Sequence, residues 1–149
     1  TWGPGAHAGT FRGNQLAMVA GTVVMERLKS PGFLEAVIRK GDKFRSRMEA
    51  LKAECPIIGD VRGKGLMLGI EFVDPNGPVD IMGHPMESGT ICARVQKECF
   101  ENHLVMEKGG RNGSTMRCLT ALNISDEDLE TGIRILEKVV RNINKEYVK

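Results

Sequence analysis

The sequence Leu-Met-Leu-Gly-Ile-Glu-Phe-Val at residues 66–73 decides the fold, because its side chains alternate between two faces as they do in a β-strand. One face carries the apolar side chains of Leu66, Leu68, Ile70 and Phe72. A shorter extended run at residues 57–61 precedes this stretch, and the glycine-flanked residues 62–65 between the two runs predict a bend or bulge. We therefore expect two neighbouring strands.

Two helices are predicted before these strands. After Gly13, apolar residues recur at helical spacing, with Asn14 as the N-cap. The sequence Ser30-Pro31-Gly32 is expected to end this helix and to begin the next, with Ser30 as the N-cap and Pro31 at the first helical position. On the second helix we expect Leu34 and Ile38 to be buried. The second helix also carries a basic run, which we interpret as a solvated face rather than a docking patch. The run consists of Arg39, Lys40, Lys43 and Arg47.

The C-terminal half predicts two more helices and two short strands. A helix is expected over residues 87–102, and strands over residues 104–107 and 115–120 flank a glycine-rich loop. The last helix is expected to begin at Ser125, with Asp128 in the capping-box position. Most of the strands are too close in sequence for parallel crossovers. The chain therefore predicts a two-layer α/β (α+β) sandwich, with a small, mostly antiparallel sheet covered by helices on one face.

Composition narrows the class of protein. The chain has 149 residues, which suits one domain of roughly 100–200 residues. Its net charge of +2 gives no reason to expect a nucleic-acid partner, and no apolar run approaches the roughly 20 residues of a membrane span. Four scattered cysteines indicate reduced thiols and a cytoplasmic protein. The first residues resemble neither an initiator methionine nor a signal peptide, so we expect a piece of a longer protein.

No complete active site can be assembled from the residues alone. His7, His84 and His103 fall into no metal-ligand spacing, and we predict no metal site. One candidate is the polar loop around Thr10, which opens directly onto the first helix. Its backbone amides, the Thr10 hydroxyl and Arg12 could hold an anion such as phosphate, although ordinary N-capping explains the same residues.

The second candidate is Arg117, which alternates with Met116 and Cys118 in a short strand. An arginine flanked by apolar residues could bind a carboxylate through two parallel hydrogen bonds. The alternative is an arginine on an edge strand that pairs with a surface Glu or Asp. The residues leave both interpretations open.

The same residues carry a resemblance to a known family. Gly-Thr-Phe-Arg-Gly-Asn-Gln-Leu-Ala at residues 9–17 resembles the Thr-aromatic-x-Gly-Asn motif of class III aminotransferases, which are fold type I pyridoxal-phosphate enzymes. Residues 59–71 resemble the strand pair of that family's C-terminal domain. Met116-Arg117 and residues 124–129 are similar to its closing strand and acidic helix start. Around Thr10 the sequence is most similar to members that act on 2,4-diaminobutyrate and 2-oxoglutarate.

The resemblance implies roles for both candidates. Thr10 would bind the phosphate of pyridoxal 5'-phosphate held by the neighbouring subunit of a homodimer, and Arg117 would bind the substrate α-carboxylate. The Schiff-base lysine belongs to the family's large domain. We therefore expect no catalytic residue in this chain and no activity from the chain alone. Residues 1–13 would form an interface loop on the large-domain side, and residues 14–149 the connecting helix and the C-terminal small domain.

The resemblance leaves the substrate open among small amino acids and 2-oxo acids. Thr120-Ala121 stands where many members have a proline pair, and Arg12 and Gln15 differ from the commoner choices near the threonine. One alternative is a class III enzyme for another ω-amino substrate, such as ornithine, acetylornithine or 4-aminobutyrate. A second alternative is a non-catalytic binding domain that remains from such an enzyme.

Overall fold

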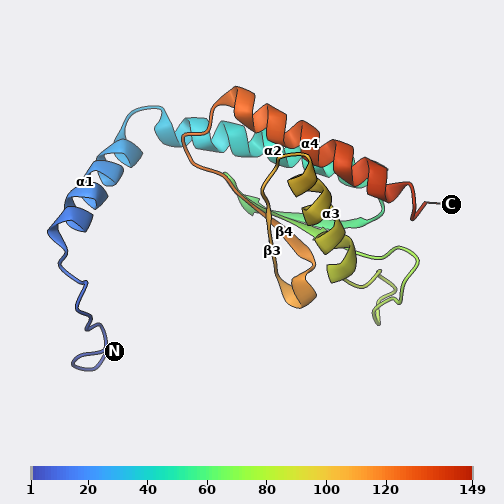
Figure 1. Cartoon of the computed structure of the whole chain (residues 1–149), viewed down its shortest axis with the longest axis horizontal. Helices are drawn as coiled ribbons and strands as arrows, with labels where there is room; N and C mark the ends of the chain where they lie inside the picture. The colour runs from blue at the N-terminus through green and yellow to red at the C-terminus, as the bar shows by residue number, and fades with distance from the viewer. Residues whose placement is uncertain (1, 149) are drawn as a thin grey trace. The chain divides into compact units, whose positions relative to one another are not determined.

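The computed structural model describes residues 2–148. In chain order its elements are α1 (Gln15–Lys29), α2 (Phe33–Glu54), β1 (Ile58–Lys64), β2 (Met67–Phe72), α3 (Gly89–Glu101), β3 (Glu107–Gly109), the 3-10 helix η1 (Arg111–Gly113), β4 (Thr115–Leu119) and α4 (Asp126–Asn144) (Figure 1). The chain divides into two compact units, Thr1–Ala36 and Val37–Lys149. The sheet lies entirely in the second unit.

The strands form one antiparallel sheet in the order β1-β2-β4-β3. The β1–β2 hairpin confirms the predicted strand pair but corrects the position of its bend. Residues 62–64 belong to β1, the turn lies at Gly65 and Leu66, and the register shift falls between Ile58 and Asp60. Gly65 has a φ of +55°, a conformation that disfavours side chains with a Cβ.

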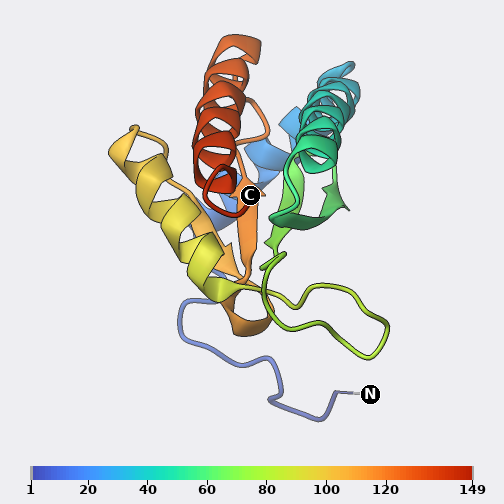
Figure 2. The same cartoon turned by 90° about the vertical axis from the view of Figure 1, so that its right-hand side faces the viewer.

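Helices α2, α3 and α4 lie together on one face of the sheet (Figure 2). The sheet residues that face the helices are almost completely buried, because they form the core with the apolar sides of the helices. They include Val61, Leu68, Ile70, Phe72, Met116 and Cys118. The other face of the sheet is open, and Met67 there is 63% exposed. This arrangement confirms the predicted two-layer sandwich with helices on one side.

The boundary between the first two helices differs from the prediction. Ser30 does not cap α2 but closes α1, because its backbone N–H and its hydroxyl both donate to the Arg27 carbonyl, at 3.1 and 2.6 Å. Gly32 has a φ of +78°, and α2 begins at Phe33. The last helix does begin as predicted, since the Asp128 N–H donates to the Ser125 hydroxyl at 2.9 Å.

The strand predicted at residues 104–107 begins only at Glu107. Helix α3 holds the preceding residues instead. The Leu104 N–H donates to the Cys99 carbonyl at 2.8 Å, and the Gln96 side chain donates to the Met106 carbonyl at 2.9 Å. Residues 104–106 therefore do not pair with β4, and the chain diverges from β4 on the N-terminal side of Glu107.

The basic run on α2 lies beside α4 and is solvated only in part, since Arg39 is exposed and Lys43 and Arg47 are partly buried. Arg39 pairs with Asp126, and Lys43 and Arg47 both pair with Glu130. Lys40, which we expected on a solvated face, is buried and donates to the Ile124 carbonyl. The expected burial of Leu34 and Ile38 is also wrong, since these side chains are 50% and 57% exposed.

Helix α1 has the predicted cap but no core of its own. The Asn14 side chain accepts hydrogen bonds from the backbone amides of Leu16 and Ala17, at 3.0 and 3.3 Å. None of the residues Gln15–Lys29 is buried, although Leu16, Val19 and Val23 are apolar. A helix with exposed apolar residues on several sides needs another surface to cover it.

Candidate functional site

Arg117 lies in the middle of the open face of the sheet. Strand β4 runs between β2 and β3, so Arg117 is opposite Gly69 on one side and Glu107 on the other. Its neighbours Met116 and Cys118 point to the helices and are 0% and 2% exposed, whereas the Arg117 side chain is 46% exposed. The predicted alternation is confirmed. The edge-strand interpretation is wrong, because β4 is an interior strand.

Within the part of the chain that the structure describes, one carboxylate contacts the Arg117 side chain. Arg117 Nη1 donates to Glu107 Oε1 at 3.1 Å, and the Glu107 side chain is 61% exposed. Ion pairs this exposed usually contribute no more than about 1 kcal/mol to stability. The surface partner that the sequence left as an alternative is therefore present, but it binds Arg117 weakly.

A second arginine on the same face is more fully neutralised. Arg62 on β1 lies on the other side of Gly69 and donates to Asp60 at 2.8 Å and to Glu71 at 2.7 Å. The hydrogen bond from Arg62 also holds the pKa of the Asp60 carboxyl below its usual value. With two carboxylates on its guanidinium, Arg62 is a poor receptor for a third. Arg117, with one carboxylate contact among residues 2–148, has more free donors for a carboxylate ligand than Arg62.

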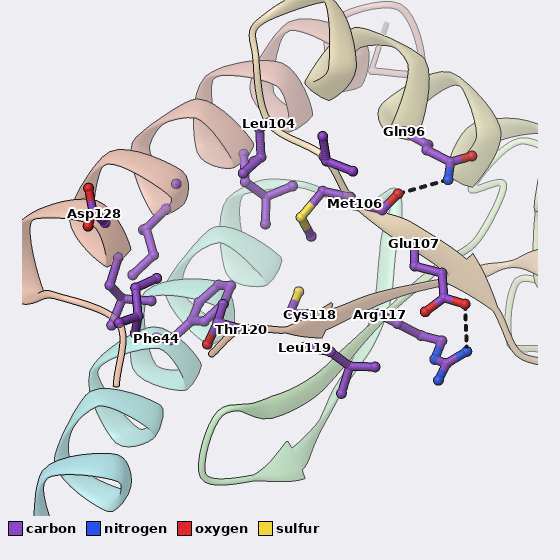
Figure 3. A pocket seen from close by; sticks show the side chains of 16 residues that line it. Phe44, Gln96, Leu104, Met106, Glu107, Arg117, Cys118, Leu119, Thr120 and Asp128 are labelled. Carbon is purple, nitrogen blue, oxygen red and sulfur yellow. Dashed lines mark hydrogen bonds and ion pairs between the residues drawn. The ribbon is translucent and has the colours of Figure 1, made fainter. Parts of the chain in front are cut away.

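A pocket of about 430 Å³ begins beside Arg117. The pocket lies between residues 104–106 and β4, where the two segments diverge. Apolar side chains of α4, such as Leu129 and Ile133, form its far wall. Figure 3 shows Arg117 and Glu107 at one end of the pocket and Asp128 at the other. Pockets of roughly 300–1,000 Å³ with apolar walls and a few polar groups suit small ligands.

Three polar residues of this pocket were not predicted from the sequence as site residues. Glu107 and Gln96 line it, and Thr120 has a buried hydroxyl oxygen with no hydrogen-bond partner within residues 2–148. Their convergence depends on the β3–β4 register and on the divergence of the two strands. Neither feature leaves a local signal in the sequence.

Thr10 belongs to the first unit, so the two predicted site residues lie in different units. It is exposed, in a turn closed by a hydrogen bond from the Arg12 N–H to the Gly9 carbonyl at 3.1 Å. The N-capping interpretation is confirmed, because Asn14 already binds the amides of Leu16 and Ala17. The Thr10 hydroxyl is exposed and follows Gly9, so the anion site in this loop stays a prediction.

The sequence profile described as Aminotransferase class-III matches residues 1–140. The chain belongs to the class III aminotransferases. Enzymes of this family depend on pyridoxal phosphate. As a class III aminotransferase chain, it spans about a third or less of the length of its relatives, between 27% and 33% of those described below.

Two relatives of this aminotransferase chain are diaminobutyrate–2-oxoglutarate aminotransferases. The enzyme of Rhizobium meliloti is 46% identical over 87% of the chain and 27% of its own length. The enzyme of Haemophilus influenzae is 37% identical over 93% of the chain and 31% of its own length.

Solved structures support the same fold. Acetylornithine aminotransferase from Elizabethkingia anophelis superposes with a TM-score of 0.72 and 28% identity, covering 95% of the chain and 33% of that structure. Ornithine aminotransferase from Toxoplasma gondii gives a TM-score of 0.76 at 24% identity, covering 99% of the chain and 32% of that structure, and so compares the fold alone.

The remaining reactive groups of this aminotransferase chain are inert or dispersed. Cys118 lines the pocket, but burial raises the pKa of its thiol to about 12, so the thiol stays protonated and unreactive near neutral pH. Within residues 2–148 no three His, Cys, Asp or Glu side chains are grouped closely enough to hold a metal ion. No helix in that range is long and apolar enough to cross a membrane.

Proposed function

We propose that this chain is the C-terminal part of a pyridoxal-phosphate-dependent aminotransferase for 2,4-diaminobutyrate and 2-oxoglutarate. Transfer of the terminal amino group would give aspartate 4-semialdehyde and glutamate. The observation that carries the proposal is Arg117, which is half exposed beside an apolar pocket and, among the described residues 2–148, is bound by a single surface carboxylate. The names of the two relatives at 46% and 37% identity support the choice of substrates.

In this proposal Arg117 binds a substrate carboxylate. A guanidinium matches a carboxylate through two parallel N–H···O bonds, which fix the orientation of the ligand as well as its position. The pocket beside Arg117 would exclude water from the carbon chain of the bound substrate. Both the amino donor and the 2-oxo acid carry a carboxylate, so one arginine can serve both halves of the reaction.

Thr10 would bind the cofactor phosphate across the interface of a homodimer. Its exposed hydroxyl can donate to a phosphate oxygen. Bound pyridoxal phosphate supplies the electron sink for amino-group transfer. The lysine that holds the cofactor would come from the large domain, so the chain alone would be inactive. Four free, buried cysteines support a reducing, cytoplasmic location.

The test is to express the complete reading frame that contains this chain and to assay it with several amino donors. We expect 2,4-diaminobutyrate to be used with the highest kcat/KM, with 2-oxoglutarate as acceptor. A preference for ornithine, acetylornithine or 4-aminobutyrate would establish a different class III activity, while a reading frame that starts near Thr1 would favour a non-catalytic remnant.

A further inference from the structure

The hydrogen bonding of the Arg117 guanidinium shows which of its N–H groups remain free for a ligand. Within residues 2–148 the hydrogen bond to Glu107 is the one that its guanidinium makes, and this bond uses Nη1. An arginine has five N–H donors, and a bidentate carboxylate needs two that point the same way. The edge formed by Nε and Nη2 therefore stays available while Glu107 holds the opposite corner.

Gly109 lies on β3, the strand of Glu107, and leaves room for the Arg117 side chain. A Cβ on Gly109 would lie 2.9 Å from Cδ of Arg117, which is closer than such atoms approach. The arginine side chain therefore passes over β3 where that strand has no side chain. Because Cδ belongs to a flexible side chain, an added methyl group would displace the arginine rather than the sheet.

We propose that Glu107 and Gly109 are positioning residues, which lay the Arg117 side chain along β3 and leave its Nε–Nη2 edge open for the substrate carboxylate. This inference rests on the proposed function of Arg117. Neither residue contacts substrate. Glu107 fixes the guanidinium at Nη1, and Gly109 leaves the space that the arginine methylene groups occupy.

A competing role for Glu107 predicts the opposite change in substrate affinity when its carboxylate is removed. If Glu107 blocked the arginine, substrate would have to displace it, and loss of the carboxylate would tighten binding. If Glu107 positions the arginine, loss of the side chain frees the guanidinium to rotate and weakens binding. Glu107→Gln keeps an oxygen that can accept from Nη1 but removes the charge, so it separates the hydrogen bond from the ion pair.

The test measures the KM for 2-oxoglutarate and kcat in the complete enzyme for Glu107→Ala, Glu107→Gln, Gly109→Ala and Arg117→Ala. We expect Glu107→Ala and Gly109→Ala to raise the KM about fivefold with kcat within about twofold, a loss of roughly 1 kcal/mol in binding, as suits an exposed ion pair. Glu107→Gln should stay close to wild type. In an Arg117→Ala background, Glu107→Ala should have no further effect.

Glu101→Ala is the matched control, because it removes an exposed glutamate paired with Lys97 on α3. An unchanged or lowered KM in Glu107→Ala, or a lowered KM in Glu107→Gln, overturns the positioning role. If Arg117→Ala itself leaves the KM unchanged, the proposed function of Arg117 fails as well. A raised KM in Arg117→Ala with wild-type values for Glu107→Ala and Gly109→Ala refutes only the inference on β3.

Discussion

Arg117 illustrates how an interior strand can present a charge to solvent. It lies between Gly69 of β2 and Glu107 of β3, its neighbours Met116 and Cys118 fill the core, and its side chain reaches the open face. Replacing Arg117 by Ala should therefore leave the fold intact while removing a charged hydrogen-bond donor, an interaction worth about 1.5–3 kcal/mol.

In the complete enzyme, Arg117→Ala should raise the KM for 2-oxoglutarate about 10- to 100-fold and leave the dissociation constant of the cofactor unchanged. Steady-state kinetics and cofactor titration measure the two quantities. Arg39→Ala is a suitable control, since Arg39 is an exposed arginine that pairs with one carboxylate, that of Asp126. An unaltered KM would refute the substrate-binding role.

Thr10 allows the complementary experiment on the cofactor. Thr10→Ala should weaken cofactor retention in the complete enzyme several-fold, because one hydrogen bond to a charged phosphate is lost. The dissociation constant, followed by cofactor absorbance, is the measurement. Thr22→Ala is the control, since the Thr22 hydroxyl donates to the Met18 carbonyl within α1. Equal dissociation constants in wild type and Thr10→Ala would argue against a phosphate contact.

Between elements, Glu130 on α4 forms ion pairs that contribute to the contact of α2 with α4. It accepts hydrogen bonds from Lys43 and Arg47 on α2 and from Arg134 on its own helix, and these, led by Lys43, lower the pKa of its carboxyl to about 2. A carboxyl whose folded pKa lies below its ordinary value of 4.5 stabilises the fold at higher pH. Its contribution is complete above that value and is lost as the pH falls toward about 2.

Glu130→Gln should therefore lower the Tm at neutral pH, and the difference from wild type should disappear as the pH falls from 4.5 to about 2. Thermal melts at a series of pH values measure this difference. Glu49→Gln on α2 is the control for loss of one surface charge. A difference that stays constant down to pH 2 would show that the ion pairs do not contribute.

Among the helices and strands, the sequence predicted those whose pattern is local, such as alternating apolar residues or a helix cap. The alternation at residues 66–73 and the cap at Ser125 are local, and both features are found in the structure. Lys40 and the start of β3 could not be predicted, because the Ile124 carbonyl and the Gln96 side chain that determine them are distant in sequence. The same holds for the site, where alternation indicated the face of Arg117 but not its partner Glu107.

For the whole molecule, the two units differ in how much they bury. The second unit contains the sheet and the helices that cover it, with side chains such as Met48 and Ile70 at 0% exposure. The first unit contains α1, in which no residue is buried. A chain that spans about a third of its relatives' length thus contains one self-sufficient core and one helix without a core.

The uncovered helix α1 has a consequence for amide hydrogen exchange. A helix of 15 residues without tertiary packing is only marginally stable in water, so it opens often. Amides of Gln15–Lys29 should exchange with deuterium at least about a hundredfold faster than those of β2, whose opening requires unfolding of the core. Mass spectrometry of the chain alone would measure both rates. Comparable protection in the two segments would mean that α1 finds a cover of its own, for instance a second copy of the chain.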